Sequence, residues 1–220
     1  MALRREEITR KLLHLFALVM PVCIFYFPKW TIPWYVAPII LGFVFVASVI
    51  VETLRFRVPF IQKIFFMFFG SMLREEESTK VTGSTWVIGA ALLCSLIFWR
   101  HGHISFIVLT MFILGDAMAA VVGLSIGRIK IFGKKSLEGS LGCFFTCMIL
   151  FLGVFPFVPG LLDVWNGKEP FILGLVTSLA ITIFELIPLR ITSKITINDN
   201  LAVPVIAGGI LFGLSKMIVF

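Results

Sequence analysis

Residues 115–142 read GDAMAAVVGLSIGRIKIFGKKSLEGSLG, and this stretch decides how the rest of the chain is interpreted. Asp116 lies inside an apolar run and is followed at helical spacing by small residues, among them Gly123 and Gly127. A basic segment comes next and leads into a second apolar run, which begins near Glu138. An acid in the middle of a membrane helix costs roughly 2.5–3.5 kcal/mol on insertion scales, so it usually has a partner or a function. The stretch therefore predicts two membrane helices joined by a charged loop.

The composition is typical of a membrane protein. The chain has 220 residues, of which 59% are hydrophobic and 14% are charged, whereas an ordinary soluble domain is about 45–50% apolar and about 25% charged. One soluble core cannot hide this much apolar surface, so part of it must face lipid. The net charge of +7 is explained by basic cytoplasmic loops, and we expect no nucleic-acid partner.

The apolar segments predict seven membrane spans, because a hydrocarbon core needs about 20 apolar residues per helix. They cover residues 12–27, 34–51, 83–99, 104–124, 141–158, 170–188 and 201–220. A further apolar segment, 58–73, carries Gln62 and Lys63 and is expected to lie in the membrane interface as a helix. The expected fold is therefore all-α, with residues 1–220 forming one polytopic membrane domain.

The positive charges predict an orientation. Fifteen of the 19 Lys and Arg residues precede the first span or lie in alternate loops, three lie in the other loops, and Lys216 is inside the last span. Cytoplasmic loops carry an excess of Lys and Arg. We therefore expect a cytoplasmic N-terminus, an odd number of spans and an external C-terminus.

Asp116 has two interpretations. Its carboxylate is a candidate Mg²⁺ ligand, with the small residues beside it leaving room for a bound molecule, because Mg²⁺ prefers oxygen ligands and often shares them with substrate phosphates. Alternatively, the small residues allow two helices to pack closely, and Asp116 is hydrogen-bonded to a neighbour.

The basic segment is suited to phosphate. Lys134, Lys135 and Ser136 precede a helix that starts near Gly139, and a helix N-terminus with lysines nearby favours an anion. The alternative is an ordinary basic loop in which Ser136 or Ser140 caps the helix.

Other acids are predicted to reach the same side of the membrane. Glu185 lies near the cytoplasmic end of the sixth span, and Asp199 and Asn200 open the last one. We therefore expect a metal–phosphate site whose candidate metal ligands are Asp116, Glu185 and Asp199.

Two further segments carry charges at helix ends. Arg10, Lys11 and His14 mark the start of the first helix, with Arg10 and His14 one turn apart. Glu52 and Arg55 are expected to pair at the end of the second span. A charge run that includes Arg74 and Glu77 precedes Thr82 and Gly83, and such a run is usually a solvated surface.

Three motifs together resemble a known family. The central stretch, RKLLH at 10–14 and DNLAVP at 199–204 are similar to the CTP-dependent lipid-alcohol kinases, which include dolichol kinase, phytol kinase and the yeast-type CTP-dependent diacylglycerol kinase. The resemblance implies transfer of the γ-phosphate of CTP to the hydroxyl of a membrane lipid alcohol at the cytoplasmic face, with Mg²⁺ as cofactor.

The resemblance also implies roles for individual residues. The candidate catalytic residues are Asp116, Lys135, Glu138, Asp199 and His14, and Glu138 is implied as a further metal ligand. The candidate nucleotide-binding residues are Lys134, Lys135, Ser136, Gly139, Gly123, Gly127, Asn200, Arg10, Lys11 and Arg74. The proton acceptor stays open among Asp116, Glu138, Asp199 and His14. Family members often have an acid where this chain has Asn198.

Two other functions stay open at this point. The central stretch also resembles part of the phosphatidate cytidylyltransferases, although their acidic and His-Gly-rich signature is absent near the C-terminus. Intramembrane acids also occur in transporters, but here they gather at one face and no inverted repeat is visible. The sequence distinguishes neither the lipid nor an oligomeric state.

Overall fold

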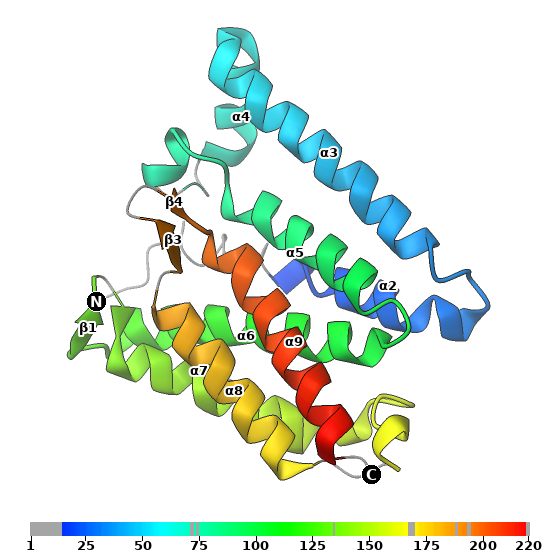
Figure 1. Cartoon of the computed structure of the whole chain (residues 1–220). Coiled ribbons are helices and arrows are strands. Elements are labelled where there is room, and N and C mark those ends of the chain that lie inside the picture. The colour runs from blue at the N-terminus through cyan, green and yellow to red at the C-terminus, as the bar shows by residue number, and fades with distance from the viewer. Residues whose placement is uncertain are drawn as a thin grey trace.

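The computed structural model describes residues 15–70, 73, 75–133, 135–166, 170–187, 189–192 and 195–218. These residues are mostly helical, and Figure 1 shows the helices crossing one another in a single bundle. The helices are α2 (Val19–Tyr26), α3 (Val36–Arg57), α4 (Pro59–Phe69), α5 (Gly83–Ile97), α6 (Gly102–Ser125), α7 (Leu137–Ile149), α8 (Phe171–Leu186) and α9 (Asp199–Ile218). A π-helical turn (Leu150–Val154) and a 3-10 turn (Phe155–Phe157) extend α7, and the other 3-10 turns are Pro28–Trp30, Glu75–Ser78 and Asp163–Trp165.

Four helical segments of the described residues are long and apolar enough to cross a membrane. They are Val36–Arg57, Gly102–Ser125, Leu137–Phe157 and Asp199–Met217. Helices α5 and α8 have 15 and 16 residues, which is about 22–24 Å of helix against a hydrocarbon core of about 30 Å. The structure thus agrees with a helical membrane protein, whereas the count of seven spans and the orientation stay predictions.

Two short β-hairpins, which the all-α prediction omitted, connect helices at one end of the bundle. Strand β1 (Lys130–Phe132) pairs antiparallel with β2 (Lys135–Ser136), and β3 (Arg190–Thr192) pairs with β4 (Ile195–Thr196). The first hairpin turns at Gly133, whose φ of 55° is a conformation that glycine adopts without a steric penalty. Each strand has only two or three residues, too few for a clear alternation in the sequence.

Helix α6 is the centre of the bundle. All of its residues from His103 to Ile113 are buried, and it contacts α2, α7, α8 and α9. The Ser105 hydroxyl donates to the Cys94 carbonyl at 3.0 Å and links α6 to α5. The buried half of α6 therefore fixes the position of its other half, which carries Asp116.

Helix α4 occupies the segment for which an interfacial helix is predicted. It starts with Pro59 in its first turn, where a missing N–H costs nothing, and it packs against α3. Phe60, Met67 and Phe68 are each more than 60% exposed, so α4 presents an apolar surface that nothing in the described structure covers. Its location in the membrane interface stays a prediction.

Candidate functional site

The candidate site lies at the end of the bundle that carries the two hairpins. There the end of α8 and the start of α9 approach the β1–β2 hairpin (Figure 1), which leads directly into α7. The hairpin places Lys135 in β2 between the two helix ends. Elements that are separated by about 50 and 64 residues along the chain therefore meet at one side chain.

Lys135 is held between two carboxylates. Its Nζ lies 3.0 Å from Glu185 Oε1 and 3.2 Å from Asp199 Oδ2, and it also donates to the backbone carbonyl of Glu185. The side chain of Glu185 is 9% exposed, whereas those of Lys135 and Asp199 are 33% and 36% exposed. The group thus has one buried acid and an open side that solvent or a ligand reaches.

The charges of this group favour a protonated lysine. Burial lowers the pKa of Lys135, but the carboxylates of Glu185 and Asp199 outweigh that effect and raise the pKa above its ordinary value. Asp116 is half-buried in α6, and both it and Asp199 act electrostatically on Glu185. Two carboxylates therefore share the Lys135 ammonium group, and a third, that of Asp116, acts on one of them.

The glycines of the central stretch serve helix packing. A Cβ on Gly127 would lie 2.5 Å from Ser136 Oγ, and a Cβ on Gly139 would lie 2.7 Å from the Ala119 carbonyl oxygen. Gly123 likewise faces Ser136 Oγ, at 3.1 Å from its virtual Cβ. The small-residue face of α6 therefore packs against Ser136 and the start of α7, as the helix-packing interpretation predicts, and room for a ligand beside Asp116 stays a prediction. A nucleotide contact from Gly123, Gly127 or Gly139 stays a prediction.

Ser136 and Glu138 both stabilise the start of α7. The Ser136 hydroxyl accepts from the Gly139 N–H at 3.2 Å, which is the capping role considered for it. A carboxylate oxygen of Glu138 accepts from the N–H groups of Arg128 at 3.0 Å and Ile129 at 3.2 Å. Glu138 thus fastens the β1–β2 hairpin to the helix through backbone N–H groups. A metal or catalytic role for it stays a prediction.

Two acids at this end are candidate ligands for a metal ion, and their metal role stays a prediction. Among the described residues, no group of three or more His, Cys, Asp or Glu side chains is arranged to hold a metal ion. Glu185 and Asp199 nevertheless supply two carboxylates within reach of one atom, Lys135 Nζ. Mg²⁺ is commonly bound by one or two carboxylates together with substrate phosphates, so the donors fit an ion that arrives with a phosphate ligand.

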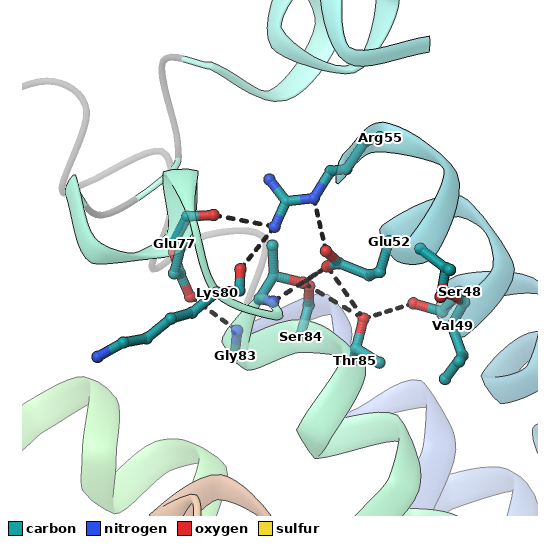
Figure 2. Close-up of polar contacts among 11 residues, drawn as sticks. Ser48, Val49, Glu52, Arg55, Glu77, Lys80, Gly83, Ser84 and Thr85 are labelled. Atoms are coloured by element: carbon teal, nitrogen blue, oxygen red, sulfur yellow. Dashed lines mark hydrogen bonds and ion pairs between the residues drawn. The ribbon is translucent and has the colours of Figure 1, made fainter. Parts of the chain in front are cut away.

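Asn200 connects the site to a second polar cluster that sequence reasoning assembled only in part. Its side-chain amide donates to the Gly83 carbonyl at 3.2 Å, at the start of α5. Beyond Gly83, Figure 2 shows a network around Arg55 and Glu52, which confirms the predicted pair at 2.6 Å. The sequence signal for the pair was an acid and a base three residues apart in an apolar helix; the contact of Gly83 with Asn200, 117 residues away, has no local signal.

Five predicted site residues lie outside the described part of the chain. They are Arg10, Lys11, His14, Arg74 and Lys134. Of the remaining candidates, the structure joins Lys135, Glu185 and Asp199 directly, and Asp116 and Asn200 lie at the margin of this group.

Comparison with known proteins gives two relatives. The chain is 29% identical over 156 residues to "Probable phytol kinase 2, chloroplastic" of Glycine max, an alignment that covers 67% of this chain and 50% of the soybean protein. It is 26% identical over 207 residues to a Rickettsia prowazekii (strain Madrid E) protein described as uncharacterized, covering 90% and 89% of the two chains. The chain thus matches about half the length of the soybean protein. No protein-family profile and no solved structure match it.

Proposed function

We propose that this protein is a CTP-dependent kinase that transfers the γ-phosphate to the hydroxyl of a membrane lipid alcohol at the cytoplasmic membrane face. The observation that carries the proposal is the meeting of Lys135, Glu185 and Asp199 at one end of a bundle of apolar helices. The similarity to a phytol kinase supports a lipid alcohol as the acceptor. Phytol, dolichol or another polyprenol, and diacylglycerol are the candidate substrates.

The arrangement suits phosphoryl transfer because that reaction needs positioning and charge neutralisation more than covalent chemistry. The Lys135 ammonium group, one-third exposed, would turn from its two carboxylates toward the phosphates of the nucleotide. Glu185 and Asp199 would hold Mg²⁺ together with those phosphates, and the ion would neutralise the charge that develops on the transferred group. Asp116 is a further candidate ligand.

The lipid would approach along the apolar helices. Its chain would lie against their exposed apolar side chains, and its hydroxyl would reach the hairpin end of the bundle, where the carboxylates gather. Asp199 is more exposed than Glu185, so among the described acids it is the better placed to accept the hydroxyl proton.

The proposal is tested by the fate of the phosphate label. Purified protein in lipid vesicles would receive CTP labelled at the γ- or the α-phosphate, with phytol, dolichol and diacylglycerol offered separately. We expect γ-label in one lipid product and none with α-labelled CTP. Label from the α-phosphate, with release of pyrophosphate, would instead establish a cytidylyltransferase. Absence of label from both nucleotides in every lipid contradicts both activities.

A second arm tests the donor and the ion. CTP is expected to be used in preference to ATP, GTP and UTP, and chelation of divalent cations is expected to abolish transfer, which Mg²⁺ then restores. Equal rates with all four nucleotides would remove the CTP preference from the proposal but leave the kinase activity standing.

A further inference from the structure

A buried ion pair anchors the turn that precedes α5. Arg55 Nε donates to Glu52 Oε2 at 2.6 Å, and the two side chains are 1% and 4% exposed. Arg55 Nη2 also donates to the carbonyls of Glu77, at 2.9 Å, and Lys80, at 2.6 Å. The Arg55 guanidinium lies 4.5 Å from the centre of the Phe65 ring of α4. The turn is thus attached to α3 by an arginine that cannot move without leaving its carboxylate unpaired.

The other carboxylate oxygen of Glu52 holds the end of the same turn. Glu52 Oε1 accepts from the N–H of Thr82 at 3.0 Å and from its hydroxyl at 2.6 Å. The Thr85 hydroxyl lies 3.4 Å from the same oxygen and 2.5 Å from the Ser48 hydroxyl, which closes the cluster toward α3 (Figure 2). Both ends of the segment 77–82 are therefore fixed by one ion pair.

The anchored segment 77–82 also fixes the start of α5. Glu77 Oε1 accepts from the Gly83 N–H at 2.7 Å, and this bond satisfies an N–H that the helix leaves without an internal partner. Thr82, which precedes the helix, makes no side-chain cap of its own. Figure 2 shows the Glu77 side chain directed at Gly83. Glu77 thus caps α5 from six residues upstream.

Gly83 then meets the start of α9. Its carbonyl accepts from Asn200 Nδ2 at 3.2 Å, and a Cβ at this position would lie 2.6 Å from the same nitrogen and 3.3 Å from Glu77 Oε1. Any larger residue at 83 therefore pushes Asn200 away. The residue before Asn200 is Asp199, whose carboxylate lies 3.2 Å from Lys135 Nζ. Gly83 is therefore connected to the candidate site through two residues, Asn200 and Asp199.

We infer that Glu77 and Gly83 are positioning residues for the reaction: the turn held by Arg55 and Glu52 sets, through Gly83 and Asn200, where Asp199 stands relative to Lys135. The inference rests on the proposed kinase activity. Neither Arg55 and Glu52 nor Glu77 and Gly83 need to touch the nucleotide or the lipid. Their effect is on the alignment of a carboxylate, and a misplacement of about 1 Å in an active site is enough to cost roughly 100-fold in rate.

The test is the substitution Gly83→Ala, with Gly213→Ala as the matched control. Gly213 is also a helical glycine, in α9, but a Cβ there meets nothing within 4 Å. We expect Gly83→Ala to lower kcat/KM for CTP about 100-fold per folded molecule, and Gly213→Ala to leave it unchanged. A purely structural role for Gly83 would reduce the yield or the thermal midpoint and leave kcat/KM of the folded fraction intact, and that result would overturn the inference.

A double-mutant cycle with Asn200→Ala tests the route. If Gly83 acts through the Asn200 side chain, then Gly83→Ala in the Asn200→Ala background should lower kcat/KM further by less than about threefold. Multiplicative losses would contradict the route. Glu77→Gln keeps the acceptor oxygen for the Gly83 N–H and should retain activity that Glu77→Ala loses.

The wild-type protein separates the two claims. If it transfers no phosphate from CTP to any lipid alcohol, the proposed function fails, and the positioning role fails with it. If it is active and Gly83→Ala has wild-type kinetic constants, only the positioning role fails.

Discussion

The protein contains two clusters in which a cation meets carboxylates, and they differ in exposure. In the first, Arg55 pairs with Glu52 at 2.6 Å, and both side chains are almost fully buried. In the second, Lys135 lies between Glu185 and Asp199 at 3.0 and 3.2 Å, and the lysine and Asp199 are about one-third exposed. The same pairing of a cation with carboxylates is therefore closed to solvent at one place and accessible to solvent at the other.

The choice of cation matches the exposure. The planar guanidinium of Arg55 donates hydrogen bonds in fixed directions to the Glu52 carboxylate and to the carbonyls of Glu77 and Lys80, which suits a buried ion pair. Lys135 carries a compact ammonium on a flexible stem, and its carboxylate partners hold it without enclosing it. Lys135 can exchange its more exposed partner, Asp199, for another anion at little cost, because exposed ion pairs contribute only about 0–1 kcal/mol. The first cluster is suited to architecture and the second to a ligand.

Replacing the buried cation, Arg55, is expected to lower the free energy of unfolding by the largest amount. Arg55→Ala leaves the Glu52 carboxylate buried without its counter-charge, and breaking such a pair costs about 3–5 kcal/mol. Thermal and denaturant unfolding of the protein in detergent would measure the loss. Thr53→Val, an exposed change on the same helix, is the control and should stay within about 0.5 kcal/mol. An Arg55→Ala protein as stable as the control would mean that the pair is not structural.

Replacing the partly exposed cation, Lys135, should affect activity more than stability. Lys135→Ala is expected to reduce kcat/KM for CTP at least about 100-fold, equivalent to about 2.7 kcal/mol of transition-state stabilisation. Its unfolding free energy should fall by less than the loss of about 3–5 kcal/mol expected for Arg55→Ala, because Lys135 and Asp199 are about one-third exposed, although Glu185 is buried. Lys130→Ala in the same hairpin, where the side chain is exposed, provides the matched control for activity. Full activity in Lys135→Ala would remove this lysine from the site.

Replacing a glycine where α6 and α7 pack should lower the free energy of unfolding by an intermediate amount. A methyl group on Gly139 would lie 2.7 Å from the Ala119 carbonyl oxygen, so Gly139→Ala must separate α7 from α6, at a cost of about 1–3 kcal/mol. Gly209→Ala in α9, where an added Cβ meets nothing within 4 Å, should cost nothing or stabilise slightly. Unfolding midpoints of the two variants decide this, and equal midpoints would contradict the close helix contact.

The sequence predicted the helices better than it predicted what lies between them. Long apolar runs specify a helix such as α6 through composition alone, and its predicted bounds, 104–124, are close to the observed Gly102–Ser125. The β1–β2 hairpin was missed because its strands have only three and two residues. Their pairing depends on the turn at Gly133 and on Glu138, which binds the N–H groups of Arg128 and Ile129 from the start of α7.

The same difference applies to the site. An acid in an apolar run is costly wherever it occurs, so Asp116 and Glu185 were identified from their positions alone. Which acids lie beside Lys135 depends on where α8 ends and where α9 begins in three dimensions. The sequence predicted only that these helix ends lie on the same side of the membrane. It gave Glu138 the same expected role as Glu185. It also had no means to connect Gly83 with Asn200, since neither residue is unusual where it stands.

The smallest expected effect is that of pH on the open cluster. The carboxylates raise the pKa of Lys135 above its ordinary value of 10.5, so its ion pairs contribute fully to stability below about pH 10.5. That contribution is lost as the pH rises through the folded-state pKa, where the ammonium group deprotonates. The difference in unfolding free energy between wild type and Lys135→Gln should therefore be constant from pH 6 to 9 and shrink in more alkaline buffer. The wild type and Arg55→Ala should show no such alkaline convergence, because arginine keeps its charge throughout this range. A wild-type-to-Lys135→Gln difference that already disappears between pH 6 and 9 would show that the carboxylates do not hold the lysine in its charged form.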